Sequence, residues 1–178
     1  MQAAEALAHS HRHDAHVIGQ KVEQIVEHFR TRVAAKIGGR AKAMIVTSSR
    51  EAAVRYHRSF REYVQEKKYD DLKAFVAFSG SVRLDDDDDG VTEEGLNGIR
   101  ESELKEKFRA SPDHRFLIVA DKYQTGYDEP LLHTMYVDKK LADVAAVQTL
   151  SRLNRRAAGK RDTFVLDFVN KAEEIQKS

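Results

Sequence analysis

The sequence predicts an α/β protein built on a doubly wound parallel sheet of about five to six strands flanked by helices. Short unbroken apolar runs, stretches with helical apolar spacing, and the alternation of these two kinds of segment along the chain lead to this prediction. An apolar run without polar alternation is typical of a strand that is covered on both faces. Strands that alternate with helices form a doubly wound sheet.

Five apolar runs supply the expected strands, namely residues 43–47, 75–78, 116–120, 135–137 and 164–166. Helical spacing is clearest over three further stretches, residues 17–34, 50–67 and 101–110. The pair Gly38-Gly39 is suited to ending the first helix. We therefore expect an N-terminal helical extension over residues 1–40 and the α/β domain over residues 41–178.

Size and composition narrow the class of protein. A chain of 178 residues can bury a core without disulfide or metal staples, and the absence of cysteine excludes disulfides, thiolate zinc sites and cysteine nucleophiles. With 30 basic and 29 acidic residues, bulk charge neither requires nor excludes a nucleic-acid partner. No apolar run approaches the roughly 20 residues of a membrane span. We expect a cytoplasmic protein with no membrane partner.

Two charged stretches are poor candidates for a metal site. Residues 84–98 hold the run Asp85 to Asp89 and several glycines, which predicts a disordered acidic surface loop. Consecutive carboxylates cannot all be aimed at one ion. Near the N-terminus, a cluster of histidines and one aspartate could bind a stray transition metal, but a polar helix start or a fraying terminus is the favoured interpretation. The cluster comprises His9, His11, His13, Asp14 and His16.

Polar residues follow the first two strands, at the carboxyl edge where open α/β sheets bind ligands. Ser48, Ser49 and Arg50 lead directly into a helix, so hydroxyls, amides and a guanidinium gather where a DNA phosphate could bind. The same segment could be an ordinary helix N-cap. After the second strand, Ser79-Gly80 allows close approach of a ligand backbone, or is simply a turn.

The third strand is followed by Thr125-Gly126-Tyr127-Asp128, which places a hydroxyl, open amides and a carboxylate within four residues. A carboxylate in such a turn can accept a hydrogen bond from a ribose hydroxyl, as in dinucleotide folds. The alternative is a polar turn that Pro130 ends.

We expect a basic helix whose N-cap is Asp143. Gln148, Arg152 and Arg155 recur at i, i+4 and i+7, so they share one face. Two guanidiniums on one face can contact phosphoryl oxygens bidentately and stabilise charge that develops in phosphoryl transfer. Without context, a basic solvent-facing helix explains the same pattern.

The order and spacing of these segments resemble motifs V and VI of superfamily 2 helicases and translocases. More narrowly, they resemble the C-terminal motor domain of type I restriction enzyme R subunits, over about residues 22–170. The segments that carry the narrower resemblance are 43–50, 76–80, 125–128, 150–155 and the stretch Leu-Leu-His-Thr-Met-Tyr-Val-Asp-Lys at 131–139.

The resemblance implies a RecA-like fold and the second half of a DNA motor. Arg155 would be the arginine finger on the γ-phosphate of ATP, with Arg152 in support, and Gln148 would couple nucleotide to DNA. Gly126 and Asp128 would bind the nucleotide, with Asp128 near the ribose. The DNA backbone would be contacted by Ser48, Ser49, Arg50, Ser79, Gly80 and Thr125.

The resemblance also implies the partners. ATP with Mg²⁺ would be held jointly with the first RecA-like domain of a parent chain, because no G-x-x-x-x-G-K-[ST] stretch occurs here. Double-stranded DNA and the modification and specificity subunits of the restriction complex would be the other partners. We expect this chain alone to be inactive, as a part of an ATP-hydrolysing type I site-specific deoxyribonuclease whose nuclease centre lies elsewhere.

Two other functions stay open on the sequence. One is the corresponding motor half of another superfamily 2 helicase or repair translocase. The other is a non-catalytic adaptor domain that binds nucleic acid or protein without using ATP, in which Arg155 would be dispensable.

Overall fold

A computed structural model describes residues 2–85, 89–120, 128–140, 159–160 and 162–169, with side chains from Asp14 onward. Five parallel strands form one sheet in the order β2-β5-β1-β6-β7. Their bounds are Lys42–Thr47 (β1), Lys73–Ala77 (β2), His114–Val119 (β5), Leu132–Asp138 (β6) and Phe164–Asp167 (β7). The predicted doubly wound sheet is confirmed, and each of the five apolar runs forms a strand.

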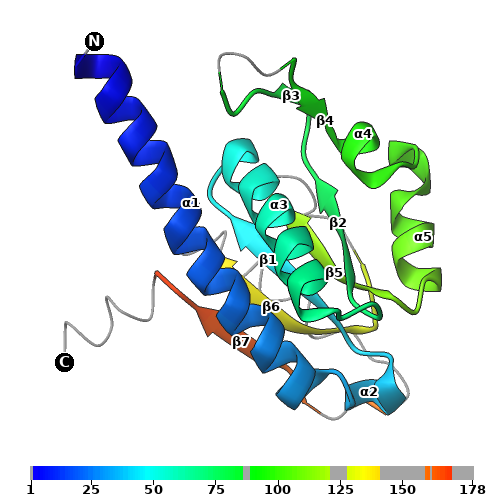
Figure 1. Cartoon of the computed structure of the whole chain (residues 1–178). Helices are drawn as coiled ribbons and strands as arrows, with labels where there is room; N and C mark the ends of the chain where they lie inside the picture. The colour runs from blue at the N-terminus through cyan, green and yellow to red at the C-terminus, as the bar shows by residue number, and fades with distance from the viewer. Residues whose placement is uncertain (1, 86–88, 121–127, 141–158, 161, 170–178) are drawn as a thin grey trace.

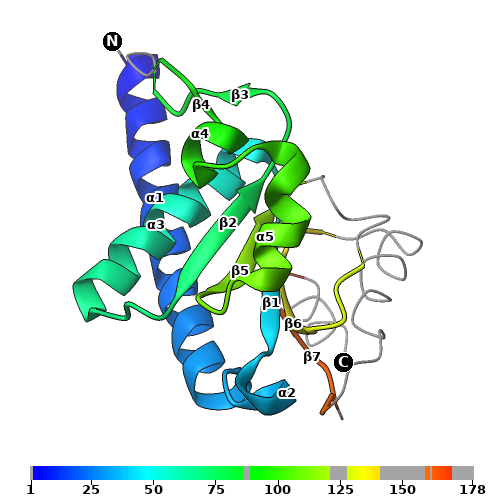
Figure 2. The same cartoon turned by 90° about the vertical axis from the view of Figure 1, so that its right-hand side faces the viewer.

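Helices cover both faces of this sheet (Figures 1 and 2). One face carries α1 (Gln2–His28) and α3 (Arg50–Lys67), and the other carries α5 (Leu104–Ala110). Short elements complete the described chain: the π-helical turn Phe29–Val33, α2 (Lys36–Gly39), β3 (Ser81–Val82), β4 (Val91–Thr92), α4 (Glu93–Asn97) and the 3-10 turn Glu101–Glu103.

Strand β1 is the centre of the core, and all six of its residues are buried. Successive side chains of a strand point to opposite faces. Ile45 therefore joins the cluster beneath α1 and α3, whereas Met44 joins the cluster beneath α5. The ring of Phe116 packs at 4.5 Å from Phe29 and 5.0 Å from Phe60, measured between centroids. Burial on both faces explains why these strands show no polar alternation.

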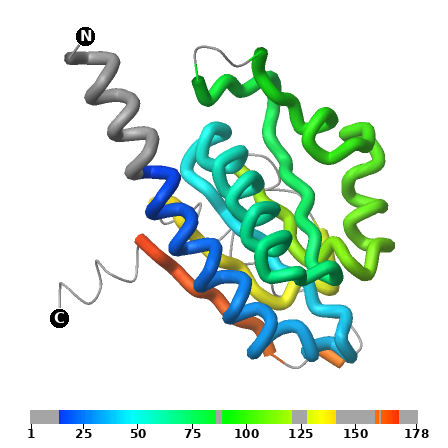
Figure 3. The backbone as a smooth tube through the Cα atoms, in the orientation of Figure 1, coloured from blue at the N-terminus to red at the C-terminus, as the bar shows by residue number. Residues whose placement is uncertain are grey.

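The N-terminal helix is packed onto the domain. Figure 3 shows the described part of α1 running beside α3, and its apolar stripe of Ile18, Val22, Ile25 and Val26 is buried in the core that α3 also covers. The helical run ends near residues 37–39, where the backbone turns left-handed with φ of 52° to 80°. A separate extension that ends at residue 40 stays a prediction.

The expectation of a disordered loop over residues 84–98 is wrong for its second half. β4 pairs antiparallel with β3, and α4 follows directly, with the Thr92 hydroxyl accepting from the amide of Gly95 at 3.1 Å. Buried Val82 and Leu84 anchor the segment. The sequence did not reveal these elements because the segment has few apolar residues. The side chains of α4 that bind the sheet are polar, so they give no hydrophobic pattern. Residues 86–88 lie outside the described part.

Side chains satisfy the outward-facing main chain of β2, the strand at one end of the sheet. Asn97 accepts from the amide of Val76 at 2.9 Å and donates to its carbonyl at 2.7 Å. The amide of Phe78 donates to Glu93 at 3.0 Å. His57 of α3 bonds the main chain of Ala74. Burial, together with the nearby Arg61, lowers the pKa of His57 to about 4.

The stability of the fold should fall in acid partly because of His57. The folded state keeps the imidazole neutral down to a pKa of about 4, whereas the unfolded chain takes up the proton near 6.5. Stability that is present above pH 6.5 is therefore lost as the pH falls towards 4, by about 3 kcal/mol for this group. Urea unfolding of the native chain and His57→Gln, at pH 7 and pH 4, measures this loss. Equal pH dependence in the two proteins would contradict the assignment.

Candidate nucleic-acid interface

Two polar loops meet at the carboxyl edge because β1 and β6 are parallel neighbours. Thr47, at the end of β1, is in register with Asp138, at the end of β6. The Thr47 hydroxyl donates to the carbonyl of Val119 at 2.8 Å, which ties β1 to β5 at the same edge. Ser49 is the N-cap of α3, its hydroxyl accepting from the amide of Ala52 at 3.0 Å. The capping interpretation is thus confirmed for Ser49, whereas Ser48 is exposed.

The loops after β1 and β2 are joined by Arg50. Its Nη1 donates to the carbonyl of Ser79 at 2.8 Å. Gly80 follows with a φ of +74°, and a Cβ placed there would lie 3.0 Å from Nη1 of Arg50. The structure therefore brings together three of the predicted DNA-contacting residues.

A cavity of about 810 Å³ opens at this edge, beside the end of β1. It is lined by residues of α1, α3, the segment after β3 and the end of β6, and it includes Ser48 and Ser49. Its charged side chains are mixed, with four carboxylates and five cations. The cations are Lys21, Arg55, Arg83, Lys139 and Lys140, and the carboxylates are Asp14, Glu51, Asp85 and Asp138.

Asp138 is bound by the protein itself. Lys21 of α1 donates to its carboxylate at 3.0 and 3.1 Å, and the Tyr56 hydroxyl of α3 donates at 2.6 Å. Burial is the main cause that raises the pKa of Tyr56 far above its ordinary value, and the hydrogen bond to Asp138 adds to it. The Tyr56 hydroxyl therefore keeps its proton and stays a donor. Asp138 thus links β6 to two helices and holds the start of the Lys139-Lys140 segment at the cavity. We did not predict this role, although an Asp-Lys-Lys run directly after a strand was visible in the sequence.

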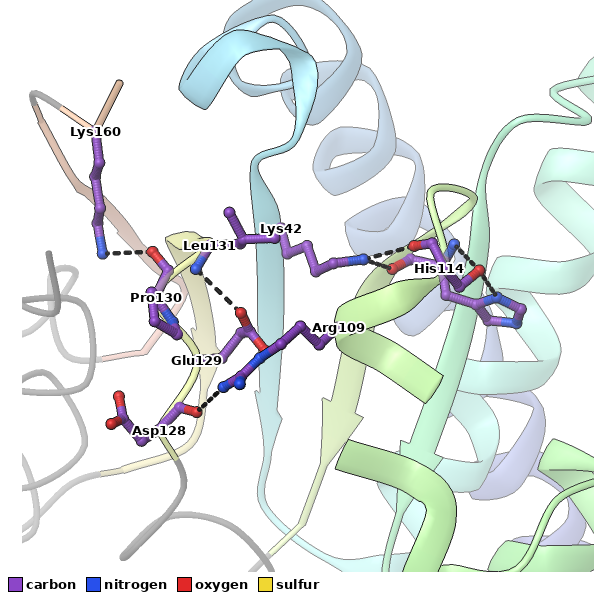
Figure 4. A network of polar contacts seen from close by, with 9 residues as sticks. Lys42, Arg109, His114, Asp128, Glu129, Pro130, Leu131 and Lys160 are labelled. Carbon is purple, nitrogen blue, oxygen red and sulfur yellow. Dashed lines mark hydrogen bonds and ion pairs between the residues drawn. The ribbon is translucent and has the colours of Figure 1, made fainter. Parts of the chain in front are cut away.

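The other predicted site residues are only partly described. Thr125, Gly126, Gln148, Arg152 and Arg155 lie outside the described residues, as does the probable N-cap Asp143. Asp128 does not line the carboxyl-edge cavity. Its carbonyl accepts from Nη2 of Arg109, in the last turn of α5, at 3.0 Å (Figure 4).

Metal binding and membrane insertion find no support in the described residues. No group of three or more histidines or carboxylates is arranged there to hold a metal ion. Nor does any helix in those ranges combine the length and apolarity that crossing a bilayer would require.

The five-stranded parallel sheet and its two helical layers form a RecA-like domain. Residues 100–170 match the family model described as type I restriction enzyme subunit R domain 3. The chain is 31% identical, over 159 residues, to a type I restriction enzyme endonuclease subunit, MjaIXP, of Methanocaldococcus jannaschii. That match covers 88% of this chain and 14% of the relative, so the chain spans about one seventh of its length.

Solved structures agree on the fold. An HsdR subunit fragment of a type I restriction enzyme from Vibrio vulnificus superposes with a TM-score of 0.61 at 13% identity, over 93% of this chain and 30% of that one. The ATP-dependent Type ISP restriction-modification enzyme LlaBIII, bound to DNA, gives 0.54 at 18% identity, over 86% and 9%. The family model and the relative show that the chain is similar in sequence to type I restriction enzyme R subunits, and the resemblance drawn from the motifs is confirmed.

Replacing Gly80 should cost more stability than replacing another left-handed glycine. Gly98 has a φ of +71°, and a Cβ placed there would meet no described atom within 4 Å. Gly98→Ala therefore carries the backbone strain alone, roughly 1–2 kcal/mol. Gly80→Ala should cost about 1 kcal/mol more, because the new methyl group displaces Arg50 from Ser79. Urea unfolding of the two variants and the native chain measures both losses of stability.

The same comparison in an Arg50→Ala background is the control, since the extra cost should disappear there. An equal cost for the two glycines in the native background would contradict the role given to Arg50.

Proposed function

We propose that this chain is the second motor half of an ATP-dependent double-stranded DNA translocase in a type I restriction-modification system. The observation that carries the proposal is the carboxyl-edge cavity, which is lined by Ser48 and Ser49 of the first motif segment and by five cations. The name of the relative MjaIXP supports the assignment to a type I restriction-modification system. LlaBIII is ATP-dependent and was solved bound to DNA, which supports ATP-dependent translocation on DNA by analogy.

In this proposal the carboxyl edge of the sheet binds the phosphates of the DNA backbone. Hydroxyls, main-chain amides and cations are the groups that contact phosphates, and such contacts position a protein without reading sequence. Arg50 already lies against Ser79 and Gly80, and Ser48 lines the adjacent cavity. Thr125 and the cations of the cavity, among them Arg55, would extend it.

The second part of the proposal is the supply of arginines to ATP. Arg155 would contact the γ-phosphate, Arg152 would support it and Gln148 would relay the nucleotide state to the DNA. The Mg²⁺ and the phosphates of ATP would be cradled by the first motor half. Closure of the two halves would complete the site, and opening would release it, so that each cycle moves the DNA by one step.

Loss of Arg155 should abolish the motor. In a protein that joins this chain to a nucleotide-cradling first half, Arg155→Ala should lower DNA-stimulated ATP turnover by roughly 10³-fold or more, because a finger stabilises charge in the transition state. Arg156→Ala, at the adjacent arginine, is the matched control and should retain turnover. Unchanged turnover in Arg155→Ala would favour the adaptor function instead.

DNA contact by the cavity can be tested on the chain alone. Arg55 lines the cavity, whereas Arg58 of the same helix does not and is exposed. Arg55→Ala should weaken binding of a fluorescent duplex, equally for different sequences, and reduce the salt dependence of log K by about 0.9, the value for one phosphate. Arg58→Ala should leave the slope unchanged. Fluorescence anisotropy over a salt series gives both quantities; identical slopes for Arg55→Ala and the native chain would exclude the contact.

A further inference from the structure

A buried carboxylate lies in the connection between β5 and β6. Only 1% of the Glu129 side chain is exposed, although it directly follows the exposed Asp128. A buried carboxylate is retained only where cations and hydrogen bonds compensate for its lost hydration. Glu129 has both: its Oε1 accepts from the amide of Leu131 at 3.2 Å, and its Oε2 accepts from Nε of Arg109 at 3.0 Å.

Arg109 contacts two of the described residues of this connection. While Nε donates to Glu129, Nη2 donates to the carbonyl of Asp128 at 3.0 Å (Figure 4). The planar guanidinium fixes the angle between these two donors, which a single ammonium group cannot do. The helix that carries Arg109 is itself held in the core by Leu104 and Phe108. The main chain at Asp128 is therefore tied to a rigid element.

Two lysines complete the surroundings of Glu129. Lys160 donates to the carbonyl of Pro130 at 3.4 Å, and the amide of Lys42 donates to the carbonyl of Leu131 at 2.8 Å. The Lys42 ammonium donates elsewhere, to the carbonyls of Ser111 and His114 (Figure 4). Burial lowers its pKa to about 8, which Glu129 partly opposes. The four residues from Asp128 to Leu131 are thus fixed to α5, to β1 and to the segment before β7.

We propose that Arg109 and Glu129 are positioning residues for Asp128. This inference rests on the proposed function, in which the Asp128 carboxylate accepts a hydrogen bond from the ribose of ATP. Arg109 holds the Asp128 carbonyl, and the Glu129 carboxylate anchors both Arg109 and the amide of Leu131, so together they set where the Asp128 carboxylate points. A displacement of about 1 Å in such a group can cost on the order of 10²-fold in activity.

The test is the preference for ATP over its 2′-deoxy and 3′-deoxy analogues, in the protein that joins this chain to the first motor half. Arg109→Ala should raise KM for ATP about tenfold and change kcat much less, because a ribose contact is made equally in the ground and transition states. The KM values for ATP and for the disfavoured deoxy analogue should then become similar. Asp128→Ala should give the same loss of preference, because alanine has no acceptor for the ribose hydroxyl.

Arg109→Lys separates positioning from stability. Lysine keeps the charge beside Glu129 but cannot also hold the Asp128 carbonyl, so the melting temperature should recover while KM for ATP stays raised. Arg30→Ala is the control, because Arg30 is also a partly exposed arginine with an acidic partner, Glu27 at 3.5 Å, but it lies in the π-helical turn after α1. It should leave KM unchanged.

The outcomes are distinct. If Asp128→Ala removes the preference for ATP and Arg109→Ala does not, the positioning role is overturned while the ribose contact stands. If Arg109→Lys restores both the melting temperature and KM, Arg109 acts through stability alone and the inference is again wrong. If Asp128→Ala leaves the preference intact, the ribose contact itself fails, and the positioning role fails with it, whatever Arg155→Ala shows of the arginine finger.

Discussion

The parallel pairing of β1 with β5 on one side and β6 on the other determines where the polar loops of this domain lie. All six residues of β1 are buried, so the strand can exist only if both faces are covered and both neighbours supply main-chain partners. Parallel strands place their carboxyl ends at one edge, and helices must carry the chain back to the other. The segments after β1, β2 and β6 therefore share an edge, although they lie far apart in the sequence.

The same geometry explains what could be predicted from the sequence. A strand covered on both faces leaves an unbroken apolar run, and all five runs were recognisable. The N-cap Ser49 and the bounds of α3 are local signals of the same kind. The contacts missed are those between distant residues, such as Lys21 with Asp138, which are 117 positions apart. The helix α4 was missed because its anchors, Glu93 and Asn97, are polar residues that bind main chain. For the arginines of the proposed finger, the sequence pattern remains the basis of the prediction.

Strand β6 has a carboxylate at each end, and each links the strand to a different layer. Glu129, just before the strand, is held by Arg109 of α5, whereas Asp138, its last residue, is held by Lys21 of α1 and Tyr56 of α3. If the cationic partner of such a buried carboxylate is removed, the carboxylate stays buried without a compensating charge. The fold then loses more stability than the ion pair contributed. The strand is thus fixed along its length between the turn that holds Asp128 and the segment that leads towards the proposed arginine finger.

The side chains that occupy the outer edge of β2 have a consequence for how copies of this domain can associate. An open edge strand offers a row of unpaired amides and carbonyls that another chain can extend, which is a common route to aggregation. Here Asn97 occupies both main-chain groups of Val76, and Glu93 occupies the amide of Phe78. A foreign strand could pair with β2 only by displacing α4. The short helix therefore protects the β2 edge against edge-to-edge polymerisation when many copies are crowded together or exposed during synthesis.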